Sequence, residues 1–206
     1  MIEPEPEVAA SLFGDRIELA REYTRELGER GEGLGLIGPL EAARLWSRHV
    51  LNCVLPAPLL RPGLVGDIGS GAGLPGIVLA IARPDVEFVL VEPMERRVEW
   101  LRSESARLGL GNVRVERARA EDAPLVGRLD QVTARAVSSL TKLIPITAPL
   151  TRRGGELLFM KGARVGDEVI AAVKQIRAAR LGDVEALVLG EGIVPEVTRV
   201  FRATVD

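Results

Sequence analysis

Three glycines at alternate positions, Gly69, Gly71 and Gly73, form the stretch of this sequence best suited to chemistry. They follow an apolar run that carries Asp67 just ahead of the turn, and Glu92 ends the next apolar run. Because glycine has no Cβ, such a turn bends tightly and lets the backbone approach a ligand. A glycine turn that serves packing alone would explain neither acidic residue. The spacing predicts a ligand-binding turn between a strand and a helix.

Two kinds of ligand fit this turn. Gly71–Gly76 matches G-x-G-x-x-G, and Glu92 then lies where a dinucleotide-binding protein holds a ribose. However, the turn already begins at Gly69, and Asp67 is poorly placed for a pyrophosphate but well placed for a cation. S-adenosylmethionine carries a sulfonium and an ammonium group and no phosphate. The pattern therefore favours S-adenosylmethionine, with Glu92 accepting hydrogen bonds from both ribose hydroxyls.

The loops after the third and fourth predicted strands narrow the chemistry. Arg119–Asp122 would flank the adenine, where a backbone N–H and an acid can read the ring edge. Thr133–Val137 lacks both the Asn or Asp with two prolines typical of amine methylation and the cysteine typical of pyrimidine-carbon methylation. It offers a cation, Arg135. A heteroaromatic nitrogen with a free lone pair, such as guanine N7, needs no general base, and proximity and in-line alignment suffice.

Arg135 and Lys161 both stand at the carboxyl ends of predicted strands, on the ligand edge of the sheet. They can hold a nucleic-acid phosphate or the carbonyl oxygen of a base. The alternative is that they form salt bridges with nearby carboxylates.

The elements that must position these residues alternate between strands and helices, which predicts an α/β fold with a mostly parallel sheet. The last two strands follow each other directly and predict an antiparallel hairpin at the edge. We expect helices over 15–27, 39–54, 75–82, 94–108, 140–150 and 165–179. We expect strands over 64–68, 86–91, 113–116, 129–134, 156–160, 184–189 and 197–203.

The domain prediction is a helical N-terminal extension, residues 1–59, followed by one domain, residues 60–206. The acidic lead 1–7 is expected to be disordered. The whole chain of 206 residues has a net charge of −2 and 47% hydrophobic residues, typical of a globular protein. No membrane span or signal peptide is evident. Cys53 alone can form neither an internal disulfide nor a zinc cluster of thiolates, so we predict no metal and a cytoplasmic protein. We also expect a monomer.

Five motifs follow one another along the chain: Arg48-His49-Val50-Leu51-Asn52, Asp67 to Gly76 with its Leu-Pro-Gly ending, Ala118-Arg119-Ala120-Glu121, Ala134-Arg135-Ala136 and Met160-Lys161-Gly162. They resemble, in the same order, the family once called glucose-inhibited division protein B, the bacterial small-subunit rRNA guanine-N7 methyltransferases. The resemblance covers roughly residues 40 to 180. It implies a class I S-adenosylmethionine-dependent methyltransferase fold, Rossmann-like, and a single target guanine near the decoding centre of 16S rRNA.

The resemblance also assigns residues to the site. Five match the family's cofactor positions: Gly69, Leu74, Ala120, Glu121 and Arg135. Lys161 and His49 match positions where the family has basic residues facing the site, so the catalytic set implied is Arg135, Lys161 and His49. A lone histidine on a helix is otherwise more often a surface or packing residue.

Two departures from the family lie in the N-terminal part. Asn52-Cys53 stands where the family usually has Asp-Ser, and the segment 33–39 replaces its usual Asn-Leu-Thr. We expect both to affect RNA docking more than cofactor binding.

Two other functions remain open from the residues. An oxidoreductase of the NAD type would need a hydride-transfer partner, yet Tyr23 is the only tyrosine. A non-catalytic RNA-binding module on the same fold would bind RNA without methylating it. Since aromatic residues make up 3% of the chain, base-stacking platforms are few, and recognition is left to shape and phosphate contacts. This favours the assembled small ribosomal subunit over naked 16S rRNA as the partner.

Overall fold

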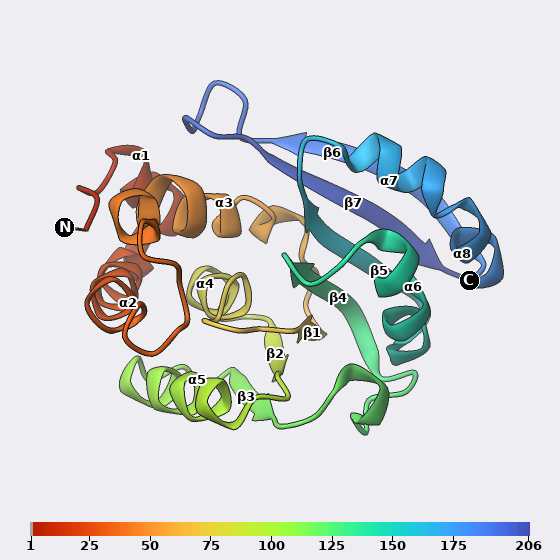
Figure 1. The fold of residues 1–206 in the computed structure, drawn as a ribbon, viewed down its shortest axis with the longest axis horizontal. Helices are drawn as coiled ribbons and strands as arrows, with labels where there is room; N and C mark the ends of the chain where they lie inside the picture. The colour runs from red at the N-terminus through yellow and green to blue at the C-terminus, as the bar shows by residue number, and fades with distance from the viewer. Residues whose placement is uncertain (1) are drawn as a thin grey trace.

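A seven-stranded mixed sheet in the order β3-β2-β1-β4-β5-β7-β6 forms the centre of the protein (Figure 1). The structure, a computed structural model, describes residues 2–206. The strands are β1 (Leu64–Ile68), β2 (Glu87–Val91), β3 (Val113–Glu116), β4 (Leu129–Arg135), β5 (Thr151–Lys161), β6 (Leu181–Leu189) and β7 (Thr198–Val205). The first five are parallel, and β7 runs antiparallel between β5 and β6. The predicted fold class is confirmed, including the C-terminal hairpin.

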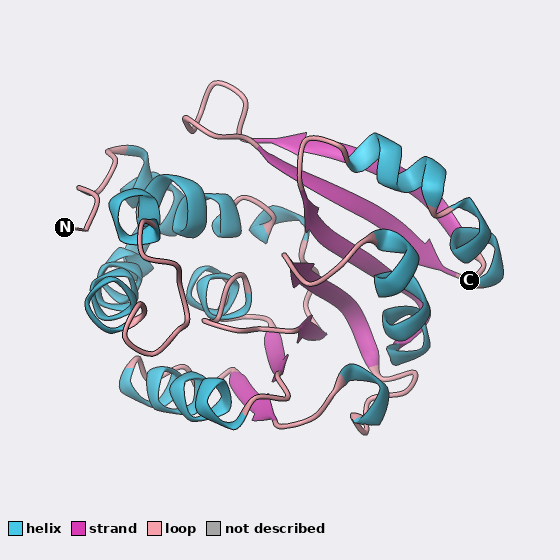
Figure 2. Cartoon of the chain, viewed as in Figure 1, coloured by secondary structure: helices cyan, strands magenta, loops and turns pink. Residues whose placement is uncertain are grey.

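Helices cover both faces of the sheet (Figure 2). One face packs against α4 (Gly76–Ala82), α5 (Glu95–Arg107) and the N-terminal helices α1 (Val8–Phe13), α2 (Ile17–Arg30) and α3 (Leu51–Val54). The other face packs against α6 (Leu140–Thr147), α7 (Val165–Ala171) and α8 (Val173–Ala178). The strands are nearly continuous apolar runs because both of their faces are buried. None of the described helices has the length and apolar character needed to cross a membrane.

The parallel order brings the carboxyl ends of β1, β2, β4 and β5 to one edge of the sheet. Strand order reverses between β1 and β4, and this switch point is where open α/β sheets bind ligands. Asp67 near the end of β1 pairs in register with Leu90 of β2 and Thr133 of β4. The glycine turn therefore leaves the sheet at the centre of this edge.

Several elements differ from the sequence-based expectation. The predicted helix 165–179 is interrupted at Ala172 and forms α7 and α8. The predicted helix 39–54 is a succession of tighter and wider turns, namely a 3-10 turn (Glu41–Arg44), a π-helical segment (Leu45–Val50) and α3. Strand β5 begins at Thr151, and its pairing with β4 shifts register between Leu129 and Gln131. This irregularity accommodates the charged and glycine residues 152–155, which hide the strand in the sequence.

The acidic lead, for which we expected disorder, lies against the N-terminal helices. The Glu3 N–H donates to the Ala42 carbonyl at 3.0 Å, and the Glu3 carboxylate accepts from the Ser47 N–H at 2.9 Å. Glu5 pairs with Arg21 of α2 at 2.6 Å. The lead is thus fixed by its own carboxylates. Met1 lies outside the described residues.

Candidate functional site

The glycine turn after β1 adopts backbone angles that favour glycine. Gly69, Gly71 and Gly73 have φ of +73°, +57° and +98°, in the left-handed region that side chains disfavour. A Cβ at Gly69 would lie 2.8 Å from the Val137 side chain, and one at Gly73 would lie 2.6 Å from Ile77. The turn needs glycine both for its shape and for close approach to its neighbours.

Asp67 supports this turn from behind. Its side chain is fully buried, and it accepts hydrogen bonds from the Gly76 N–H at 3.0 Å and from the Thr133 hydroxyl at 3.3 Å. Burial raises the pKa of Asp67 to about 6, although these hydrogen bonds oppose the rise. Among the described residues that line the cavities beside the turn, Asp67 is absent. A direct contact between Asp67 and a cationic ligand therefore stays a prediction.

Glu92, directly after β2, connects the turn to the next loop. Its carboxylate, 2% exposed, accepts from the Gly71 N–H and from the Met94 N–H, each at 3.0 Å. Glu92 lines a cavity of about 360 Å³, the Glu92 cavity, together with Gly69, Ala120 and Glu121. The loop after β3 thus reaches this cavity, and its contact with an adenine stays a prediction.

A second cavity, of about 280 Å³, lies on the other side of Gly69. This His49 cavity is lined by Gly69, Gly71, Leu74, His49 and Arg135, among others. The two cavities share Gly69, Arg97 and Ala136. An elongated ligand that carries a nucleoside at one end and an amino acid at the other can therefore lie across the turn.

Arg135, at the end of β4, extends to the N-terminal helices. Its guanidinium donates to His49 Nδ1 at 2.7 Å, to the Arg48 carbonyl at 3.2 Å and to Cys53 Sγ at 3.2 Å. His49 Nε2 in turn contacts the Glu41 carboxylate. Burial raises the pKa of the Cys53 thiol, so this cysteine is a neutral hydrogen-bond partner at neutral pH.

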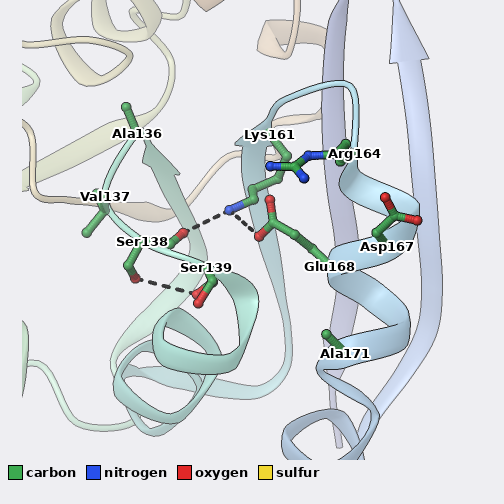
Figure 3. A pocket seen from close by; sticks show the side chains of 9 residues that line it. All are labelled: Ala136, Val137, Ser138, Ser139, Lys161, Arg164, Asp167, Glu168 and Ala171. Carbon is green, nitrogen blue, oxygen red and sulfur yellow. Dashed lines mark hydrogen bonds and ion pairs between the residues drawn. The ribbon is translucent and has the colours of Figure 1, made fainter.

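Lys161, at the end of β5, is largely occupied by contacts within the protein. Figure 3 shows it between Ser138, on the loop after β4, and Glu168 of α7. Its ammonium donates to the Ser138 carbonyl at 2.8 Å and pairs with Glu168 at 2.7 Å, and 9% of its side chain is exposed. Glu168 also accepts from the Leu140 N–H at 3.0 Å. Of the two alternatives for Lys161, the structure contains the salt bridge, and this pair holds the loop after β4.

A third cavity, of about 460 Å³, opens on the far side of Arg135. This Arg199 cavity is lined by four cations, Arg48, Arg135, Lys161 and Arg199, and by two carboxylates, Glu168 and Glu196. Glu168 pairs with Lys161 at 2.7 Å and Glu196 with Arg48 at 3.1 Å. Arg135 and Ala136 line both this cavity and the His49 cavity. They form the wall between a space beside the glycine turn and a space in which the cations outnumber the carboxylates by two.

Sequence reasoning missed two residues that hold the turn. The Tyr23 hydroxyl of α2 and the Trp100 indole N–H of α5 both donate to the Ala72 carbonyl, at 2.9 and 2.8 Å. Both side chains are buried, and their positions in sequence show only an apolar helix face.

The segment 33–39 also contributes, since Leu36, Ile37 and Gly38 line the His49 cavity. This N-terminal departure from the family pattern therefore borders the glycine turn.

The residues present fit S-adenosylmethionine. Glycines stand where a Cβ would fill the turn, a buried carboxylate follows β2, and two cavities share Gly69 in their lining. We propose Gly69, Gly71, Gly73, Leu74 and Glu92 as the core of the cofactor site. We propose that Ala120, Glu121 and Arg135 complete it.

The chain is similar to proteins of one family along nearly its whole length. The family model described as rRNA small subunit methyltransferase G (GidB) matches residues 16–192. The protein of that name from Clavibacter michiganensis subsp. michiganensis is 68% identical over 205 residues, covering 100% of this chain and 97% of the relative. The one from Leifsonia xyli subsp. xyli is 63% identical and covers 99% of this chain and 98% of the relative.

Solved structures share the fold at low sequence identity. A SAM-dependent methyltransferase from Aquifex aeolicus superposes with a TM-score of 0.59 at 18% identity, covering 84% of this chain and 96% of that chain. A tRNA (m1A58) methyltransferase from Aquifex aeolicus gives a TM-score of 0.54 at 17% identity, covering 76% of this chain and 66% of that chain. The family match leaves the oxidoreductase and the non-catalytic module without support. The chain belongs to the rRNA small subunit methyltransferase G family and is an S-adenosylmethionine-dependent rRNA methyltransferase.

Proposed function

We propose that this chain transfers a methyl group from S-adenosylmethionine to N7 of a guanine in 16S rRNA of the small ribosomal subunit. The family fit supports an rRNA substrate. The observation that carries the guanine proposal is the wall formed by Arg135 and Ala136 between the His49 cavity and the Arg199 cavity. One cavity borders the glycine turn, and the other offers cations to a polyanion.

S-adenosylmethionine, when bound, supplies an electrophilic methyl carbon on sulfur. The turn from Gly69 to Gly73 holds the cofactor by its backbone, and Glu92 accepts from the ribose hydroxyls. Arg135 donates to the guanine carbonyl oxygen or a nearby phosphate, and Lys161 fixes the loop that carries Ala136. These residues orient the two reactants in line, which is the main contribution that such a transfer requires.

Two side chains that could act as a base or a nucleophile, His49 and Cys53, are instead in contact with other side chains of the protein. His49 lies between Arg135 and Glu41, and Cys53 is buried against Arg135. N7 of guanine has a lone pair in the ring plane and needs neither group. When bound, S-adenosylmethionine would supply the methyl group and its sulfur would keep the electron pair of the broken bond, so neither His49 nor Cys53 would have to remove a proton.

The assembled small subunit is the substrate form we propose, with the protein acting as a cytoplasmic monomer. Arg199, which lines the Arg199 cavity, would meet the RNA backbone, and Arg48 would do so by exchanging its ion pair with Glu196 for a phosphate. We propose residues 60–206 as the methyltransferase domain. Residues 1–59 form an extension that completes its site through His49 and Tyr23.

The test uses small subunits from a strain that lacks this gene, incubated with the protein and tritiated S-adenosylmethionine. The RNA is then treated with borohydride and aniline, which break the strand at N7-methylguanine. Label with a single cleavage site is the expected result. Label without cleavage would overturn the N7 assignment, and no label on subunits together with label on naked 16S rRNA would overturn the assembled substrate.

A further inference from the structure

Three side chains from separate elements form a continuous chain of contacts at the wall of the His49 cavity. Glu41 lies in the 3-10 turn before the π-helical segment, His49 lies within that segment, and Arg135 ends β4. The two nitrogens of His49 contact different partners, Nε2 the Glu41 carboxylate and Nδ1 the Arg135 guanidinium at 2.7 Å. His49 is largely enclosed, with 13% of its side chain exposed.

The chemistry of these partners determines the protonation of the ring. A guanidinium only donates hydrogen bonds, and a carboxylate only accepts them. Nδ1 must therefore be the acceptor toward Arg135. The proton of the neutral ring is on Nε2, where it is donated to Glu41. A protonated ring would turn an N–H donor toward the donors of Arg135.

The surrounding charges also favour the neutral ring. Burial lowers the pKa of His49 below its ordinary value, and the positive charges of Arg135 and Arg48 lower it further. The Glu41 carboxylate acts in the opposite direction. Hydrogen bonds, first from Arg44 and then from His49, lower the pKa of Glu41 and keep it ionised.

Arg135 gains its direction from these contacts. Three of its N–H groups are committed to His49, Arg48 and Cys53, all on the N-terminal helices. The guanidinium has five N–H groups in one rigid plane. Fixing three of them therefore fixes the direction of the other two, at the wall shared with the Arg199 cavity.

We propose that Glu41 and His49 are positioning residues, which hold the Arg135 guanidinium in its working orientation as long as His49 is neutral. This inference rests on the proposed function, because Arg135 acts there on the target nucleotide. Protonation of His49 replaces the acceptor with a donor and releases one contact of Arg135. Methyl transfer should then fall at acidic pH through His49.

The first test reads the ring directly and does not depend on activity. His49 is the only histidine in the sequence, so the imidazole nitrogen resonances of an untagged, ¹⁵N-labelled protein belong to it alone. We expect a neutral ring with the proton on Nε2 at pH 7.5 and a pKa below that of an ordinary histidine. The Glu41→Gln substitution removes the anion that stabilises the imidazolium, so it should lower this pKa. The Glu99→Gln substitution, at an exposed position of α5, should leave it unchanged. A proton on Nδ1, or a pKa unaffected by E41Q, would overturn the proposal.

The second test follows methyl transfer to small subunits against pH at saturating S-adenosylmethionine. His49→Asn places an amide oxygen near the position of Nδ1 and cannot be protonated, whereas His49→Ala provides no acceptor. H49A should lose about tenfold or more in kcat/KM, in line with loss of a hydrogen bond to a charged group. H49N should recover most of that loss at neutral pH.

The ratio of H49N to wild-type activity isolates His49 from other titrating groups. Asp67, with a pKa of about 6, titrates in both proteins and cancels in this ratio. The ratio should rise as the pH falls, and E41Q should shift the acidic decline of the wild-type profile to lower pH. A constant ratio would overturn the inference. If the wild-type protein methylates nothing on the subunit, the proposed function fails, while the resonances of His49 still decide whether Glu41 and Arg135 set its tautomer.

Discussion

The Ala72 carbonyl in the glycine turn accepts two hydrogen bonds from residues that are far apart in the sequence. This shared acceptor predicts that substitutions of the two donors have non-additive effects on stability. Tyr23 donates from α2 at 2.9 Å and Trp100 from α5 at 2.8 Å, both in buried surroundings. In Tyr23→Phe, the carbonyl keeps Trp100 as a partner, so the substitution costs about one net hydrogen bond, ~1 kcal/mol. In Trp100→Phe, the carbonyl keeps Tyr23, and the cost of lost packing is added.

The Tyr23→Phe/Trp100→Phe double variant should lose more free energy of unfolding than the two single variants lose together. With both donors removed, a buried carbonyl has no partner, which adds a desolvation penalty of about 1–3 kcal/mol. Lost packing at Trp100, including its contact with the Arg30 guanidinium 5.9 Å from the ring, occurs in both arms of the cycle and cancels. We therefore expect a coupling free energy of about 1–2 kcal/mol between Tyr23 and Trp100.

Urea unfolding followed by far-UV circular dichroism measures the four proteins without relying on tryptophan emission. The dissociation constant for S-adenosylmethionine, measured by calorimetry, should rise further in the double variant than the two single effects predict. Free energies of unfolding that add to within about 0.5 kcal/mol would refute the idea that the two residues share one acceptor.

Three further changes test how the turn is built. Asp67→Asn replaces a buried carboxyl group, whose pKa is raised to about 6, with an amide that does not titrate. Because of the raised pKa, the free energy of unfolding of the wild-type protein should fall as the pH rises from about 4 to 6. Urea titrations across that window should show the variant gaining up to about 3 kcal/mol relative to wild type. Glu92→Gln turns a donor toward one of the two backbone N–H groups that the carboxylate accepts, and calorimetry should detect at least about tenfold weaker cofactor binding. In Gly76→Ala, the new Cβ would lie 2.5 Å from Asp67 Oδ2, so unfolding should become about 1–3 kcal/mol easier, whereas Gly111→Ala, which meets open space, should change stability little.

The sequence predicted the parts of the site that depend on neighbours along the chain. The glycine spacing fixes the backbone of the turn, and Glu92 directly follows a strand whose apolar run is plain in the sequence. Parallel pairing then brings Glu92, Arg135 and Lys161 to one edge, because β1, β2, β4 and β5 end there. Local spacing and one topological rule are sufficient for this much.

The contacts made by Arg135 could not be predicted in the same way. Its three partners lie 82 to 87 residues earlier in the sequence, on helical turns whose irregular winding no periodicity indicates. The pairing of Lys161 with Glu168 depends on how α7 packs against the loop after β4. The sequence shows that a charged residue stands at the end of β4 and of β5, but it does not show which group that residue contacts.

These long-range contacts make the N-terminal extension part of the site. Tyr23 supports the turn, His49 and Cys53 hold Arg135, and Leu36 and Ile37 line the cavity beside the glycines. We therefore expect a change in the extension to act on cofactor and target together, because the turn and Arg135 line the same His49 cavity. Departures from the family pattern in this region should alter cofactor affinity as well as RNA docking. The effects on cofactor affinity and on RNA docking cannot be assigned to different parts of the chain, because residues of the N-terminal extension line the site itself.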